Sequence, residues 1–137
     1  MTFVHTHRVR YHETDAQSYL FNSRYLEIAD VAMTEFFRHL GFSYGDLNAQ
    51  GVDPSVVNVQ LSFQAPAFFD DVLDFHVTCL RVGRTSFALE HTVMRDSTQL
   101  AKIVVVYVNV EAAQAAARPL PTAIAELLSR DVASADS

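Results

Sequence analysis

The chain opens with a strand-like alternation of residues and then changes to a helical period. In residues 3–11 every second residue falls on the same side, which is typical of a half-buried strand. After a polar stretch, apolar residues recur at helical spacing, so residues 23–40 are expected to form one long helix. Asn22 suits the N-cap of this helix, and Gly41 suits the position just after it. The apolar stripe comprises Tyr25, Ala29, Ala32, Met33, Phe36 and Leu40.

The rest of the chain is dominated by the two-residue period of β-strands. After a connection over residues 41–53, the pattern predicts strands over residues 57–63, 73–78, 85–95 and 100–110. Turn residues between the later strands predict a meander. The last strand is apolar on both faces in its middle, as expected of a strand covered on both sides, and a partner subunit is one source of such a cover.

This order of elements predicts an α+β fold in which a curved antiparallel sheet wraps around one long central helix. A lone helix with so apolar a face must be enclosed by other elements. The alternative is a two-layer sandwich in which the helix lies flat on the sheet. Periodicity alone does not distinguish the two architectures. We expect a single domain over residues 1–130, ending in a short helix over residues 122–129, and a frayed tail over residues 131–137.

Composition narrows the classes of function. The 137 residues carry a net charge of −6, and the basic residues are scattered, so nucleic acid is not an expected partner. The longest apolar stretch, residues 103–108, is too short to cross a bilayer, and the N-terminus lacks the apolar run of a signal peptide. The single Cys79 favours a reducing compartment, so we expect a cytoplasmic protein without a membrane partner.

One segment carries a family resemblance. Residues 9–37, VRYHETDAQSYLFNSRYLEIADVAMTEFF, resemble the signature of the hotdog-fold acyl-CoA thioesterases of the 4-hydroxybenzoyl-CoA thioesterase type. Three further landmarks of that family follow in the same order along the chain. They are LSFQAP with FDD (residues 61–66 and 69–71), VGRTSF (residues 82–87) and RPLP (residues 118–121).

The resemblance implies a hotdog fold, and a homodimer or homotetramer with active sites at the dimer interface. It also implies that the aspartate of the first loop, Asp15, is catalytic. The chain departs from the family at two positions. Ser18 stands where the family commonly has Gly, and Asn22 stands where many members have His or Tyr. The identity of the acyl group, and coenzyme A or acyl carrier protein as its carrier, stay open.

Thioester hydrolysis requires a group that activates water or attacks the carbonyl, and a donor for the oxyanion. Asp15 is the candidate for the first task, as general base or nucleophile, and an Asx turn is its structural alternative. The backbone N–H of Asn22 or Ser23, at the helix start, is the candidate oxyanion donor, with the Asn22 side chain as an N-cap. Glu13, the neighbouring carboxylate, is expected to face solvent.

Substrate contacts are expected from three further residues. Arg84, with Ser86 in the same turn, is a candidate for binding the phosphates of coenzyme A, and Tyr25 for lining an acyl tunnel rather than only packing in the core. No cofactor is expected, since the coenzyme A thioester is the substrate. No metal site is expected either, because alternate histidines such as His5 and His7 are typical of an ordinary strand surface.

An acyl-CoA thioesterase is therefore the favoured function. The alternative is a hotdog protein without that activity, either a non-catalytic acyl-thioester-binding module or a hydratase-like enzyme. Hydratase relatives place a catalytic His beside an acidic helix residue. The expected helix has Glu27 and Asp30, but no His in a suitable loop before it.

Overall fold

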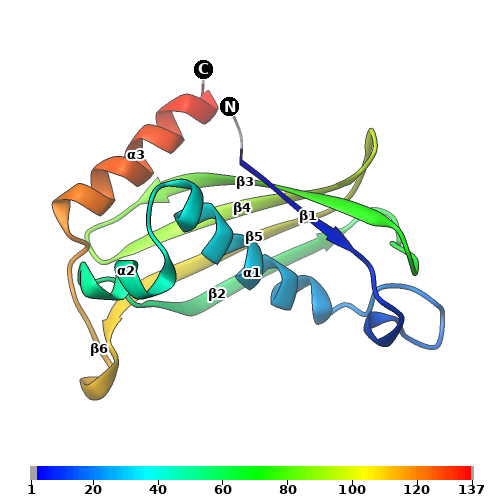
Figure 1. Ribbon diagram of the computed structural model, residues 1–137, viewed down its shortest axis with the longest axis horizontal. Coiled ribbons are helices and arrows are strands. Elements are labelled where there is room, and N and C mark those ends of the chain that lie inside the picture. The colour runs from blue at the N-terminus through cyan, green and yellow to red at the C-terminus, as the bar shows by residue number, and fades with distance from the viewer. Residues whose placement is uncertain (1–2, 137) are drawn as a thin grey trace.

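Long antiparallel strands and one buried helix make up most of the molecule, which a computed structural model describes over residues 3–136 (Figure 1). The strands form one six-stranded sheet in the order β1-β3-β4-β5-β2, with the short β6 paired to β5. The strands are β1 (Phe3–Arg8), β2 (Pro54–Phe63), β3 (Val72–Val82), β4 (Ser86–Arg95), β5 (Thr98–Glu111) and β6 (Ala116–Ala117). The helices are η1 (Tyr11–Glu13), α1 (Arg24–His39), α2 (Tyr44–Ala49), η2 (Ala112–Gln114) and α3 (Thr122–Asp136).

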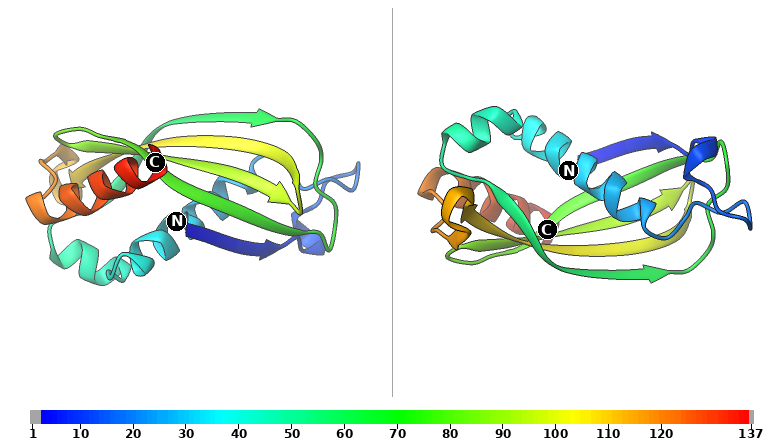
Figure 2. Two further views of the ribbon diagram at one scale, coloured as in Figure 1. Left: turned by 90° about the horizontal axis from the view of Figure 1, so that it is seen from above. Right: turned by 90° about the horizontal axis from the view of Figure 1, so that it is seen from below.

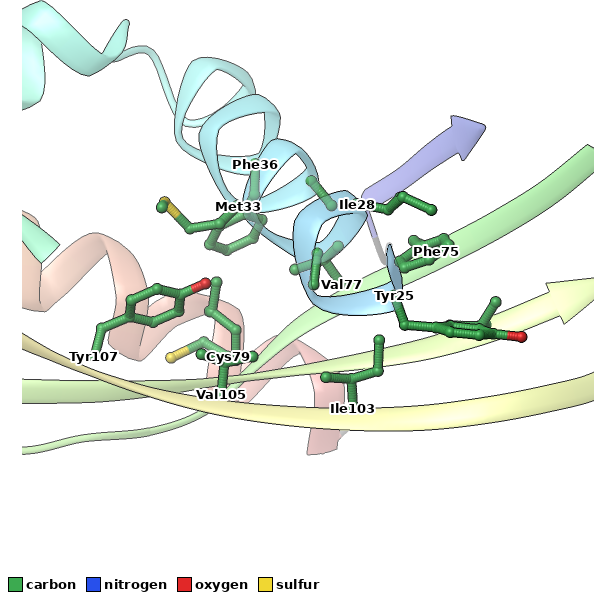
Figure 3. Close-up of a cluster of buried hydrophobic side chains, with 14 of the residues drawn as sticks. Tyr25, Ile28, Met33, Phe36, Phe75, Val77, Cys79, Ile103, Val105 and Tyr107 are labelled. Carbon is green, nitrogen blue, oxygen red and sulfur yellow. The ribbon is translucent and has the colours of Figure 1, made fainter. Parts of the chain in front are cut away.

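The sheet curls around α1, which confirms the curved-sheet prediction over the flat sandwich (Figure 2). The apolar stripe of α1 is buried against the inner faces of β3, β4 and β5 (Figure 3). Phe36 and Tyr107, both almost fully buried, are among the largest side chains of this core. Burying a side chain of this size contributes roughly 2 to 3 kcal/mol to stability, so the stripe explains why α1 occupies the centre.

The predicted meander is confirmed for β3, β4 and β5, but β2 takes another place. It pairs with β5, with Val59 opposite Val105, and does not lie beside β3. The connection over residues 64–71 therefore crosses the end of the sheet, over three strand spacings or about 14 Å. This crossing leaves β2 as an open edge strand, and it brings the connection over the end of the sheet where α1 begins.

Several element ends differ from the sequence prediction. β1 ends at Arg8 instead of residue 11, because the Glu13 carboxylate accepts the Arg10 N–H (2.7 Å) and turns the chain into η1. α2 lies within the connection over residues 41–53, for which no helix was predicted, and the Ser43 hydroxyl caps it by accepting the Asp46 N–H. α3 continues to Asp136, so the segment expected to fray from residue 131 is helical, and residue 137 lies outside the described residues.

α3 covers the part of β3 that β1 does not reach. Within residues 3–136, the pairing of β1 with β3 extends as far as Val77, and α3 lies along the edge of β3 beyond that residue. There the Cys79 N–H donates to the Asp131 carboxylate (2.6 Å), and Ile124 and Leu128 are buried. A covered edge is protected from pairing with other chains, in contrast to the open edge of β2.

His91 is a buried histidine on the inner face of β4, beside Phe75. Within the described residues, neither ring nitrogen has a hydrogen-bond partner. Burial, together with the nearby His5, lowers the pKa of His91 to about 4. The folded protein therefore keeps this ring neutral at pH values where the unfolded chain binds a proton.

We expect His91 to make the fold sensitive to acid. No stability is lost at His91 above its unfolded pKa of about 6.5, and about 3 kcal/mol is lost as the pH falls from there to about 4. Urea unfolding at pH 7 and pH 4.5 should show a smaller acid loss for His91→Leu than for wild type. His12→Leu, at an exposed histidine, is the control. Equal losses of unfolding free energy between pH 7 and pH 4.5 in wild type and His91→Leu would contradict this expectation.

Candidate active site

A small hairpin between η1 and α1 carries Asp15. Its two arms are joined by the Phe21 N–H to the Glu13 carbonyl (2.9 Å) and by the Asp15 N–H to the Tyr19 carbonyl (2.9 Å). Between these bonds, Thr14 and Leu20 form an isolated antiparallel bridge. The hairpin places Asp15 at the end of the sheet where β2 stops and α1 begins.

The Asp15 carboxylate uses one of its oxygens to shape the hairpin tip. Oδ1 accepts the N–H groups of Gln17 (2.9 Å) and Tyr19 (3.2 Å), so the Asx-type turn considered as the structural alternative is present. Ser18 has a φ of 65°, a left-handed conformation that explains why Gly is common at this position in the resembling family. Oδ2 of Asp15 has no protein partner among the described residues and is left for other contacts.

The start of α1 leaves backbone donors unused. Ser23 is the N-cap residue, but it has helical backbone angles and no side-chain cap, because the chain enters through a turn that joins the Arg24 N–H to the Phe21 carbonyl (2.9 Å). The prediction that the Asn22 side chain caps the helix is therefore wrong. Among the described residues, the N–H groups of Asn22 and Ser23 donate to no protein acceptor, as the oxyanion-donor prediction requires.

Asp15 and Asn22 line one cleft of about 400 Å³. The cleft lies between the hairpin, the start of α1 and the end of β2. Ser23 is not part of its lining, so of the two candidate donors only Asn22 belongs to the same hollow as Asp15. The far wall comes from the QAP segment of the family landmark, and no feature of the sequence pattern indicated that this segment lines the site. The remaining lining residues are Gln17, Tyr19, Leu20, Tyr25, Phe63, Gln64, Ala65 and Pro66.

Tyr25 is a wall of this cleft and also part of the core. Its side chain is buried, and its ring packs edge-on against Phe63 of β2, with the ring centres 5.1 Å apart. Burial raises the pKa of Tyr25 above its ordinary value, so the hydroxyl stays protonated at neutral pH. Tyr25 thus combines the two roles that the sequence left open, packing and lining a hollow.

Arg84 and Ser86 lie at the opposite end of the sheet. They belong to the turn between β3 and β4, which is closed by the Gly83 N–H donating to the Ser86 carbonyl (2.7 Å). The ten residues of β4 separate this turn from the Asp15 end by about 30 Å. Within one chain, the structure therefore does not bring Arg84 and Ser86 to Asp15.

Arg84 instead borders a second hollow of about 590 Å³ against the start of α3. Arg130 and Thr122 of α3 also line this hollow, whereas Ser86 does not. The hollow therefore combines two guanidinium groups with the first turn of a long helix, whose N-terminus carries a partial positive charge.

Glu13 does not face solvent as expected. Its side chain is buried, and Oε1 accepts both the Arg10 N–H (2.7 Å) and His7 Nε2 (2.9 Å). Burial alone would raise the pKa of Glu13, but these bonds outweigh it and hold the pKa below its ordinary value. Three-dimensional proximity of β1 and η1 creates this pair, and the alternation of residues 3–11 gives no sign of it.

No group of three or more His, Cys, Asp or Glu side chains among the described residues has the arrangement of a metal site. No helix in the described part of the chain is long and apolar enough to cross a membrane.

Comparison with known proteins agrees with this architecture. The profile of the thioesterase-like superfamily matches residues 9–128. The acyl-CoA thioester hydrolase YbgC of Escherichia coli is 30% identical over 118 residues, which is 85% of this chain and 88% of the relative. The chain therefore belongs to the thioesterase-like superfamily, and the predictions of this family and of a thioesterase-class enzyme are confirmed.

Solved structures extend the agreement to the fold. A hypothetical protein from Thermus thermophilus has a TM-score of 0.87 at 27% identity, covering 96% of this chain and 98% of that chain. A DHNA-CoA thioesterase from Staphylococcus aureus has a TM-score of 0.90 at 16% identity, covering 98% of this chain and 93% of that chain. The second likeness concerns the fold alone. Together with the observed sheet curled around α1, these likenesses confirm the hotdog fold.

Proposed function

We propose that the protein hydrolyses an acyl- or aroyl-CoA thioester to the free acid and coenzyme A in the Asp15 cleft. The observation that carries this proposal is the presence of a carboxylate oxygen of Asp15 and a backbone N–H of Asn22 at one hollow, both without a protein partner in the part of the chain that the structure describes. The name of the Escherichia coli relative, an acyl-CoA thioester hydrolase, supports the substrate class. A free, buried Cys79 is compatible with the cytoplasm, where coenzyme A thioesters are used.

In the proposed reaction, Asp15 acts on the thioester carbonyl while Asn22 holds its oxygen. As a general base, Oδ2 takes a proton from water, whose oxygen attacks the carbonyl carbon. The carbonyl oxygen becomes an oxyanion that accepts the Asn22 N–H. The C–S bond then breaks, its electron pair leaves with sulfur, and the proton on Asp15 passes to the thiolate. As a nucleophile, Oδ2 attacks the carbon itself, and the C–S bond breaks with its electron pair on sulfur, which leaves a mixed anhydride and a thiolate. Water then hydrolyses the anhydride, which releases the free acid, restores the Asp15 carboxylate and supplies the proton that the thiolate takes up.

A homodimer is part of this proposal, built by pairing the open edge of β2 with its copy. The β2 strand exposes Val57 and Phe63, which are 57% and 50% accessible. An open apolar edge of this kind favours pairing with another strand. Symmetric antiparallel pairing sets the Pro54 end of one copy beside the Phe63 end of the other. The Pro54 end is also the end that carries Arg84, so Arg84 of one copy approaches the Asp15 cleft of the other.

The Arg84 hollow then has a role in the same reaction. Arg84 and Arg130 are suited to bind the phosphates of coenzyme A, because guanidinium groups bind phosphate with paired hydrogen bonds. The Ser86 contact with substrate stays a prediction tied to this turn. Pairing of dimers into a homotetramer would cover the outer face of β5, where Val104 and Val106 are only half-buried.

We expect light scattering at micromolar concentration to give at least twice the chain mass of 15.3 kDa. Val57→Lys, on the open edge of β2, should shift the mass towards that of one chain, because a buried lysine at the pairing edge lacks a partner. Val31→Lys, at an exposed valine of α1, is the matched control and should leave the assembly unchanged. A wild-type particle of 15.3 kDa would contradict the dimer.

A panel of acyl- and aroyl-CoA thioesters, followed by thiol release, tests the proposed function. We expect turnover of at least one member, with release of one free thiol for each acid formed. Binding of the panel without thiol release would favour the non-catalytic alternative. The hydratase-like alternative receives no support from the cleft, whose described lining contains no histidine.

A further inference from the structure

The buried carboxylate closest in sequence to Asp15 has no task in the reaction proposed above. Glu13 is 8% accessible, although an isolated carboxylate is costly to bury. Glu13 lies at the base of the hairpin that carries Asp15, so a role in holding this hairpin would explain why the carboxylate is buried. This inference rests on the proposed function of Asp15.

We propose that Glu13 is a positioning residue that fixes the arm of the hairpin carrying Asp15. Its carboxylate ties this arm to β1 through His7 Nε2 (2.9 Å), and it also accepts the Arg10 N–H (2.7 Å) at the start of η1. His7 belongs to β1, which is paired along its length with β3. The carboxylate therefore connects the hairpin to the hydrogen-bonded sheet.

The backbone of Glu13 adds a second connection, to the start of α1. Its carbonyl accepts the Phe21 N–H (2.9 Å), and Phe21 directly precedes Asn22. One residue thus contacts both the strand before Asp15 and the segment that presents the Asn22 N–H. A shift of Glu13 would change the distance between the carboxylate of Asp15 and the candidate oxyanion donor.

The other bonds of the hairpin do not replace this anchor. The bonds of Asp15 Oδ1 to Gln17 and Tyr19 are local to the exposed tip and leave its orientation free. The second arm has an anchor of its own, the Leu20 N–H donating to the Ala67 carbonyl (2.8 Å). The first arm, which carries Asp15, is held to η1 by the Thr14 hydroxyl donating to the Tyr11 carbonyl (2.8 Å), and among the described residues its side-chain link to β1 is the Glu13 carboxylate.

Loss of the Glu13 carboxylate should therefore lower turnover more than substrate binding. A catalytic group displaced by about 1 Å loses up to about 10²-fold in rate. We expect Glu13→Ala to lower kcat by about 10-fold or more with KM within about 3-fold of wild type. Glu13→Gln should recover most of this loss, since its amide oxygen still accepts the Arg10 N–H. Glu27→Ala is the control, because Glu27 lines the same side of η1 and α1 but contacts only Arg24.

A double-mutant cycle separates positioning from a general loss of structure. If Glu13 acts through Asp15, adding Glu13→Ala to Asp15→Asn should slow turnover by less than about 2-fold beyond Asp15→Asn alone. A multiplicative loss in the double variant would overturn the proposal. So would a wild-type kcat of Glu13→Ala when Asp15→Asn is strongly impaired. Where Glu13→Ala does not fold, His7→Leu replaces it, because that change removes one of the two donors.

Amide hydrogen exchange tests the anchor without activity. Glu13→Ala should exchange the Asp15 and Phe21 amides, which join the two arms of the hairpin, at least about 10-fold faster than wild type, whereas Glu27→Ala should not. Unchanged exchange at both amides would overturn the proposal. An Asp15→Asn variant with full turnover would instead refute the proposed function, while faster exchange in Glu13→Ala would still support Glu13 as the anchor of the hairpin.

Discussion

Asp15→Asn is expected to lower turnover at least about 10²-fold while leaving the fold unchanged, since 10² is the low end for a positioned acid–base group. The variant removes the negative charge and the basic oxygen from the Asp15 cleft. It keeps the size of the side chain almost unchanged and leaves the other residues that line the cleft as they are. Steady-state kinetics on the best member of the thioester panel, with thermal unfolding of both proteins, measures the effect.

The structure explains why this substitution separates catalysis from loop shape. Oδ1 of Asp15 accepts the Gln17 and Tyr19 amides, and the oxygen of an Asn side chain can accept both in the same way. Only the second carboxylate oxygen, which has no protein partner in the described structure, is replaced by an NH₂ group. If Asp15 served only the turn, the variant would turn over almost normally.

A second carboxylate at the same end of the sheet provides the control. Asp70 is exposed and has a φ of 69°, a conformation that Asn tolerates well. Asp70→Asn makes the same chemical change outside the cleft and should keep nearly full activity. Glu13→Gln is less suitable, because the buried Glu13 carboxylate holds the hairpin. Retention of more than about a tenth of the wild-type rate in folded Asp15→Asn would refute its catalytic role.

Residue periodicity was sufficient to predict the long helix α1, the four long strands and the central layer of the fold, but not α2 or the ends of β1 and α3. The apolar stripe on α1 and the two-residue alternation in β3, β4 and β5 indicate which faces are buried. Those faces pack against one another in the structure. The residue pattern did not predict which strand β2 pairs with in the sheet. An alternating strand pairs equally well with β3 or β5, and only the path of residues 64–71 across the end of the sheet decides between them.

The candidate site was predictable where function depends on neighbours in sequence. Asp15 and Asn22 belong to one short hairpin and helix start, so their shared cleft follows from local structure. Glu13 was misjudged because its partner His7 lies on β1, and nothing in a polar loop indicates that a carboxylate there will be buried. Arg84 and Ser86 were grouped with Asp15 by the family landmarks, although the length of β4 separates them within one chain.

Asn109 is a second residue that the pattern does not reveal, since it interrupts an apolar strand as a single polar residue. It is fully buried near the end of β5, where its side chain joins three segments. Oδ1 accepts the Asp53 N–H (2.8 Å), and Nδ2 donates to the carbonyls of Gly51 (2.9 Å) and Pro119 (3.2 Å). The amide therefore connects the entry to β2, the strand β5 and the RPLP segment.

We expect Asn109→Ala to lower the free energy of unfolding by about 3 to 5 kcal/mol. The change leaves one N–H and two carbonyl groups without their partner, and each unsatisfied buried group costs about 1 to 3 kcal/mol. Some of this cost is recovered by water in the space vacated by the side chain. Urea unfolding at neutral pH measures the loss.

Asn48→Ala is the matched control for this prediction. The Asn48 side chain donates one bond, to the Val52 carbonyl (2.8 Å), and is exposed, so its removal should cost only about 1 kcal/mol. The difference between the two variants isolates the effect of burial and of several partners at one amide. Because the Asn109 N–H also donates to the Thr85 carbonyl (2.7 Å), any strand distortion in Asn109→Ala would reach the neighbouring Arg84 turn. Equal losses in both variants would show that the three segments hold together without the Asn109 side chain.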